Sequence, residues 1–145
     1  MKQSPHMQQV VQRLTGRHRV DLFQPGAFLR LDMPGCDSLV FDNLGQSQIA
    51  IAYCFEQRGE WCTDREVIFF VNNQCFVPIE ITQAVTGWMA FAKIDTTSQQ
   101  IVRINQCNQA MLAEFTERWA HRIEQQNWLE RGIRFEPWVP PSSRR

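Results

Sequence analysis

Four acidic side chains and one amide gather around a single expected hairpin in this sequence of 145 residues. They are Glu56, Gln57, Glu60, Asp64 and Glu66. Carboxylates that converge on one turn could hold a divalent cation, which prefers hard oxygen ligands, or could separate into a general acid and a general base through mutual pKa shifts. A metal-dependent hydrolase or nuclease is therefore one hypothesis for this chain.

A structural interpretation competes with the chemical one. A solvated hairpin end would pair the carboxylates with Arg58 and Arg65, and exposed ion pairs of this kind are common and add little stability. Glu117 and His121, four residues apart on an expected helix, could also ligate a metal or move a proton, but neighbouring arginines favour a charged outer face. We therefore expect no catalytic residue, no metal and no cofactor.

Composition narrows the classes of function further. The sequence contains no motif typical of phosphate-binding loops, dinucleotide sites, serine hydrolases or zinc proteases. Fifteen basic and fifteen acidic residues cancel, so no net positive charge favours nucleic acid. No apolar signal segment opens the chain, and its longest apolar run, Val67 to Val71, is far too short to span a membrane. Five cysteines in no zinc or redox spacing are expected as free thiols in the cytoplasm.

The elements that must position these residues begin with a short helix. Ser4 and Pro5 form a typical helix start, with Ser as the N-cap and Pro at the first helical position. Apolar residues then recur with the spacing of one helix face, and Gly16 is expected to end the helix in the left-handed conformation. The face consists of Met7, Val10, Val11 and Leu14.

Between Ala27 and Asp95 the apolar period changes to two, which predicts strands. They are expected over residues 29–33, 38–42, 48–57, 60–62 and then 66–71, 75–82 and 87–95. A strict two-residue turn at Arg58-Gly59 would place Asp64 and Glu66 on the apolar face. We therefore expect a bulge or a break near Thr63-Asp64 that resets the alternation. Residues 99–104 fit either a short strand or a lead-in to the next helix.

A long amphipathic helix is expected from Asn105 to Trp128, with Trp119 on its apolar side. The segment Ile133 to Arg145 contains three prolines and favours an extended backbone. Phe135, Trp138 and Val139 are its candidate partner-binding residues, since a tail left in water has no need of a Trp. This tail could dock on its own domain, dock on a second copy, or remain a frayed terminus.

Together these elements predict one α+β domain over residues 1–132 and an extended tail over residues 133–145. The domain combines an N-terminal helix, five or six mainly antiparallel strands and a long C-terminal helix packed on one sheet face. Such a domain is long enough to bury one core.

Several segments in order resemble a family of small uncharacterised bacterial, plasmid and phage proteins classed as a domain of unknown function. The similarity centres on the strand and hairpin Ile49 to Glu60, with the signature Tyr53-x-x-Glu56-Gln57-x-Gly59-Glu60. Phe76-x-Pro78, Gly87 and the segment Trp119 to Gln126 add to it. The chain departs from the family in having Arg65 in place of Pro and Cys75 in place of Trp. The resemblance implies a fold and a bacterial or mobile-element setting, but no activity.

The functional expectation is a non-enzymatic protein-binding or regulatory module of the cytoplasm, with a protein partner or a second copy of the chain. Two alternatives stay open: the metal-dependent hydrolase or nuclease described above, and a small-ligand binder in the groove between sheet and helix.

Overall fold

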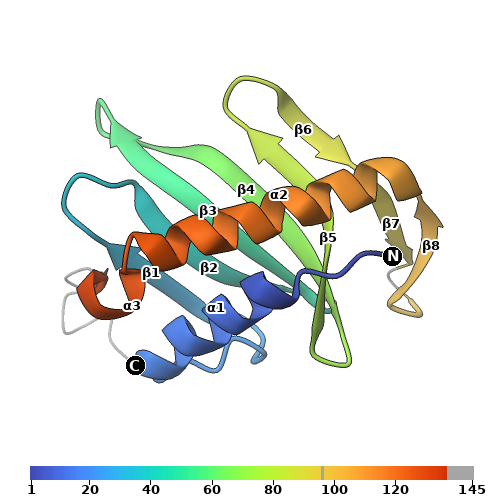
Figure 1. Ribbon diagram of the computed structural model, residues 1–145, viewed down its shortest axis with the longest axis horizontal. Coiled ribbons are helices and arrows are strands. Elements are labelled where there is room, and N and C mark those ends of the chain that lie inside the picture. The colour runs from blue at the N-terminus through green and yellow to red at the C-terminus, as the bar shows by residue number, and fades with distance from the viewer. Residues whose placement is uncertain (96, 137–145) are drawn as a thin grey trace, which may run out of the picture.

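A seven-stranded antiparallel sheet with helices on one face dominates the computed structural model, which describes residues 1–95 and 97–136 (Figure 1). The strand order is β6-β5-β4-β3-β2-β1-β9, so the strands form a meander to which the C-terminal strand is added beside β1. This architecture confirms the predicted α+β class, the N-terminal helix and the long C-terminal helix on one sheet face.

The elements have the following bounds. The helices are α1 (Pro5–Arg17), α2 (Gln106–Gln125) and α3 (Trp128–Arg131). The main sheet contains β1 (Phe28–Asp32), β2 (Ser38–Gly45), β3 (Gln48–Gln57), β4 (Glu60–Asn72), β5 (Cys75–Gln83), β6 (Gly87–Ala90) and β9 (Ile133–Arg134). A second, two-stranded sheet contains β7 (Ala92–Asp95) and β8 (Gln100–Ile104).

The number of strands exceeds the expected five or six for two reasons. The single strand expected over residues 87–95 is divided at Phe91, whose N–H donates to the Ile79 carbonyl while its own carbonyl accepts from Asn105. The chain therefore leaves the main sheet and pairs β7 with β8, which settles residues 100–104 as a strand. In addition, β9 joins the outer edge of β1.

The β3–β4 hairpin contains the bulge expected from the sequence. Its turn is formed by Arg58 and Gly59, both with positive φ, of 54° and 81°. Tyr53 pairs with Arg65, but Cys54 pairs with Thr63, so Asp64 is the extra residue. The bulge restores Val67 and Phe69 to the buried face, which confirms the prediction and its physical reason.

Both main helices pack on the same face of the sheet, and α2 lies diagonally across the middle strands (Figure 1). The largest fully buried side chains come from α2, from its extension α3 and from the inward positions of the central strands. They include Trp119, Trp128, Phe41, Phe69 and Phe76. The apolar stripes read from the sequence therefore form one continuous core.

Two helix ends differ from the sequence-based predictions. Gly16 does not end α1, which continues to Arg17, and the residue with positive φ is Arg19 at 57°. The C-terminal helix stops at Gln125 rather than near Trp128, because Asn127 adopts a left-handed conformation with φ 63°. The chain then restarts as α3, which turns Trp128 into the core.

The first residues of the expected tail lie against β1. Leu31 pairs with Arg134, and the Phe135 N–H donates to the Arg30 carbonyl at 2.9 Å. The Phe135 ring lies over the Arg30 guanidinium, 3.8 Å from ring centroid to Cζ. Trp138 and Val139 lie outside the described residues.

Candidate functional site

The hairpin residues singled out in the sequence do not form one cluster. Strand alternation places Glu56 and Glu66 on the sheet face away from α2, whereas Gln57 and Glu60 lie exposed at the hairpin end. Asp64, at the bulge, lines a groove on the helix side. Within residues 1–95 and 97–136, no group of three potential metal ligands includes any of these five residues.

The groove that contains Asp64 is the candidate functional site, and we call it the polar groove. It has a volume of about 260 Å³ and lies between the β1–β2 turn, the β4 bulge and the C-terminal half of α2. Its lining residues are Gly35, Cys36, Asp37, Tyr53, Asp64, Arg65, Trp119, Arg122 and Gln126.

Local structure explains how distant residues meet there. Gly35, with φ 77°, lets the chain reverse between β1 and β2 and so brings Asp37 to the groove. The bulge inserts Asp64 before Arg65, which stays on the helix-covered face with Val67. On α2, Trp119 and Arg122 are one turn apart and therefore share a side of the helix.

Two N–H groups of the polar groove lack a hydrogen-bond partner. Arg65 packs beneath α2, with its Cζ 5.2 Å from the Phe115 ring centroid and 5.6 Å from that of Trp119. Among the described residues, neither Arg65 Nε nor Trp119 Nε1 finds an acceptor, and both atoms are buried. Because buried donors are nearly always satisfied in folded proteins, unmet donors on two neighbouring side chains need an explanation.

Carboxyl groups provide the opposite polarity in the same groove. Burial raises the pKa of Asp37, and the charge and hydrogen-bonding contact of Asp64 raise it further, while the Arg65 charge opposes the rise. The carboxyl oxygens of these two residues place hydrogen-bond acceptors beside the unmet donors of the groove.

Tyr53 closes the inner end of the groove. Its hydroxyl donates to Gln126 Oε1 at 3.1 Å, and the Trp128 indole N–H donates to the same oxygen at 3.0 Å. Burial raises the pKa of the Tyr53 hydroxyl. With the carboxyl groups of Asp37 and Asp64 and the guanidinium groups of Arg65 and Arg122, the groove carries both hydrogen-bond donors and acceptors.

A family model described as "Domain of unknown function (DUF6908)" matches residues 6–129. The chain belongs to this family. The match runs from the start of α1 into α3, so every lining residue of the polar groove lies in the DUF6908 domain, whereas β9 lies beyond it. No curated protein and no solved structure is significantly similar to the chain.

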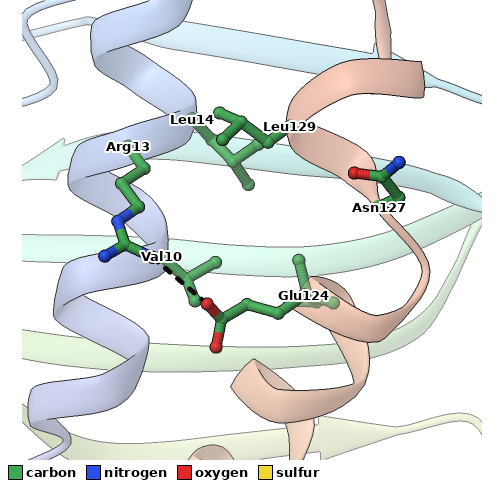
Figure 2. A pocket seen from close by; sticks show the side chains of 7 residues that line it. Val10, Arg13, Leu14, Glu124, Asn127 and Leu129 are labelled. Carbon is green, nitrogen blue, oxygen red and sulfur yellow. Dashed lines mark hydrogen bonds and ion pairs between the residues drawn. The ribbon is translucent and has the colours of Figure 1, made fainter.

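A second hollow of the DUF6908 domain lies between α1 and the α2–α3 junction (Figure 2). It is smaller, about 120 Å³, and Leu14 and Leu129 face each other across it. Its charged residues, Arg13 and Glu124, already pair with each other at 3.3 Å. It therefore presents no unmet polar group comparable with those of the polar groove.

In the described part of the DUF6908 domain, no helix is both long enough and apolar enough to cross a membrane. The helices instead use their apolar faces for the core, as the burial of Leu112, Trp119 and Ile123 on α2 illustrates.

On the opposite sheet face, β7 and β8 cover one end of the main sheet, where they pack against Phe70, Val77 and Ile79 of β4 and β5. Glu66 of β4 lies on this face, with Glu80 on the adjacent strand β5 and Asp42 on β2, beyond β3. Burial raises the pKa of the Glu66 carboxyl, and the charges of Asp42 and Glu80 raise it further. The ionised Glu66 is therefore destabilised in the folded protein.

We expect Glu66→Gln to increase the free energy of unfolding at neutral pH by up to about 1 kcal/mol, the usual limit for a partly solvated charge. A carboxyl whose pKa is raised by folding stabilises the fold fully below its unfolded pKa, and this contribution disappears as pH rises through the folded pKa. The gain should therefore vanish at acidic pH in a urea-denaturation series. Glu56→Gln, an exposed change on the same face, is the control, and a loss of stability at neutral pH would contradict the prediction.

Proposed function

We propose that the protein is a non-enzymatic binding module that takes an extended segment of a protein partner into the polar groove. The observation that carries this proposal is the pair of buried, unpartnered N–H groups on Arg65 and Trp119, as far as the described residues extend. A buried donor without an acceptor costs the free protein about 1–3 kcal/mol. A partner that provides acceptors would recover that free energy on binding.

The polarity of the groove supports a polypeptide as the occupant. A peptide backbone offers carbonyl acceptors and N–H donors in alternation, which match the guanidinium donors of Arg65 and the acids Asp37 and Asp64. The Arg65 guanidinium would present its Nε to a carbonyl after a rotation of the side chain.

From the sequence resemblance, we propose that the protein acts in the cytoplasm of a bacterial cell, encoded by the chromosome or by a mobile genetic element such as a plasmid or phage. The proposal also retains Phe135, Trp138 and Val139 as partner contacts. Phe135 supports this role because its ring is 40% exposed at the edge of the sheet. A second copy of the chain is one partner that could use these residues.

The test is selection of peptides from a random displayed library on the immobilised protein. We expect related sequences to be enriched, and their affinity for Arg65→Met to fall at least about tenfold, the effect of losing one hydrogen bond to a charged group. Arg65→Met keeps the aliphatic packing and removes an unmet donor, so its free energy of unfolding should equal that of wild type or exceed it by up to about 1–3 kcal/mol.

Arg118→Met is the matched control, because Arg118 lies on the exposed side of α2. It should leave peptide binding unchanged. If no sequence family is enriched, or if the selected peptides bind Arg65→Met as well as wild type, the polar groove is not the binding site.

A further inference from the structure

Three potential metal ligands from two helices meet on the outer side of the α1–α2 pair. His6 stands in the first turn of α1, while His121 and Glu124 are three residues apart on α2 and thus share one side of that helix. One ligand atom from each residue lies within 4.8 Å of the other two. The His6 and His121 rings have their centroids 6.0 Å apart.

The types of these side chains select a class of ion. Imidazole nitrogens suit zinc and the later first-row transition metals, whereas Mg²⁺ and Ca²⁺ prefer sites built wholly from oxygen. Two histidines and one carboxylate form a common set of three protein ligands for Zn²⁺, with a fourth position left for water or an external group. Tetrahedral Zn²⁺ binds nitrogen and oxygen ligands at about 2.0–2.1 Å, so the ligand atoms around it lie closer to one another than the 4.8 Å that bounds their separation here. A modest change of side-chain rotamers would bring the three ligand atoms to that spacing.

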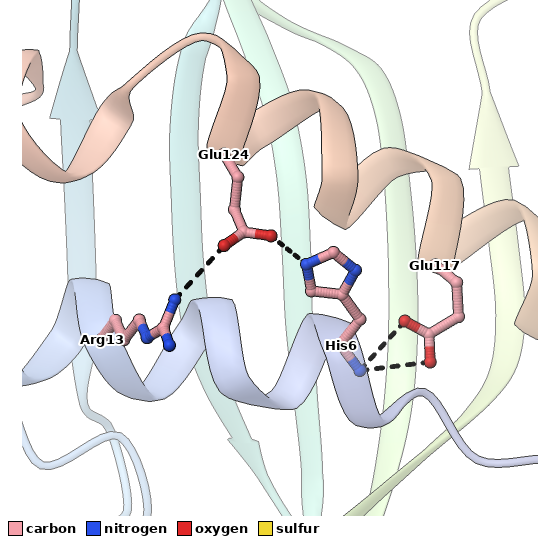
Figure 3. A network of polar contacts seen from close by, with 4 residues as sticks. All are labelled: His6, Arg13, Glu117 and Glu124. Atoms are coloured by element: carbon pink, nitrogen blue, oxygen red, sulfur yellow. Dashed lines mark hydrogen bonds and ion pairs between the residues drawn. The ribbon is translucent and has the colours of Figure 1, made fainter.

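Neighbouring charged groups already hold two of the ligands in place (Figure 3). The Glu117 carboxylate accepts from the His6 backbone N–H at 3.0 and 3.2 Å, which fixes the start of α1 against α2. Arg13 donates to Glu124 Oε2 at 3.3 Å, while Glu124 Oε1 contacts His6 Nε2. The Arg13 hydrogen bond is of the kind that orients a metal-ligating carboxylate, and a bound metal would replace the direct contact between Glu124 and His6.

We propose that His6, His121 and Glu124 form a binding site for a divalent transition metal of the zinc class, which clamps the start of α1 to α2. The site is separate from the polar groove, because the two share no lining residue or ligand. Their tests are therefore independent, and failure of one leaves the other standing.

The experiment uses the full chain made without a histidine tag and stripped of metal with a chelator. Zn²⁺ should bind with one-to-one stoichiometry in isothermal titration calorimetry and raise Tm, whereas Mg²⁺ should do neither. Co²⁺ should give the absorption bands of a tetrahedral complex. His121→Ala should weaken Zn²⁺ binding at least about tenfold, which is the usual scale for the loss of one metal-site group.

His121 is the decisive position because its side chain is exposed, so its replacement leaves the fold intact. His18→Ala is the matched control, since His18 is the one histidine of the chain outside the cluster. Zinc binding that survives His121→Ala, that falls equally in His18→Ala, or that disappears when the five cysteines are alkylated would overturn the proposal.

Discussion

Trp119→Ala should lower the free energy of unfolding by about 3–5 kcal/mol, the usual range for emptying a large aromatic site in a core. The Trp119 side chain is only 1% exposed and is among the largest fully buried groups of the protein. It packs edge-on against Tyr53, with ring centroids 5.3 Å apart, and therefore connects α2 with the middle of the sheet. Equilibrium denaturation by urea measures the effect.

Met111→Ala is the control on the same helix, because Met111 is 66% exposed. Its effect should stay within about 0.5 kcal/mol. A loss below about 1 kcal/mol for Trp119→Ala would mean that α2 presents another side to the sheet, against the range expected for a buried Trp.

Local patterns carry the parts of the fold that the sequence predicts well. Alternation through Ile49, Ile51 and Tyr53 defines β3 because one face of that strand meets the helices and stays dry. The same reasoning predicts a bulge or break near Thr63-Asp64, since without it two acids would fall on the apolar face, and the structure makes Asp64 the extra residue. In both cases, burial acts on residues close together in the chain, so the alternation of apolar and polar residues in the sequence reveals it.

Features that depend on contacts between distant segments produce no such pattern in the sequence. The short strand β9 exists because the edge of β1 offers unpaired backbone groups to Ile133 and Arg134, roughly a hundred residues further along the chain. The division at Phe91 likewise depends on hydrogen bonds to Ile79 and Asn105. Neither partner can be read from the composition of the segment itself.

The candidate site illustrates the same limit. Sequence proximity suggests a carboxylate cluster at the hairpin, but the bulge at Asp64 breaks the alternation, so Asp64 lines the groove on the helix side while Glu66 lies on the opposite face. The partner that Asp64 does meet is Asp37, delivered by a separate turn. One signal is present in the sequence. Arg65, Val67 and Phe69 follow one another at every second position and therefore share a strand face, which puts a charged residue on an apolar face. Such a mismatch between residue type and pattern is typical of functional sites.

Trp128→Ala should also lower the free energy of unfolding by about 3–5 kcal/mol, although Trp128 lies beyond the end of the long helix. Its side chain is 0% exposed, because the left-handed Asn127 redirects the chain and turns the indole inward. The indole N–H donates to Gln126 Oε1, the atom that also accepts from Tyr53. The change therefore removes core packing and one of two hydrogen bonds at the inner end of the polar groove.

Trp128→Phe separates these two contributions. Phe keeps most of the aromatic packing but cannot donate to Gln126, so we expect a loss that includes only about 0.5–1.5 kcal/mol from the hydrogen bond. Leu129→Ala, at a neighbouring position that is 38% exposed, should have a small effect in the same denaturation experiment. Equal losses for Trp128→Ala and Leu129→Ala would show that α3 does not seal the core. A larger loss for Trp128→Ala than for Leu129→Ala would instead mean that α3 closes this end of the core. The buried Trp128 indole then holds Gln126, and through it Tyr53, in place beside the polar groove.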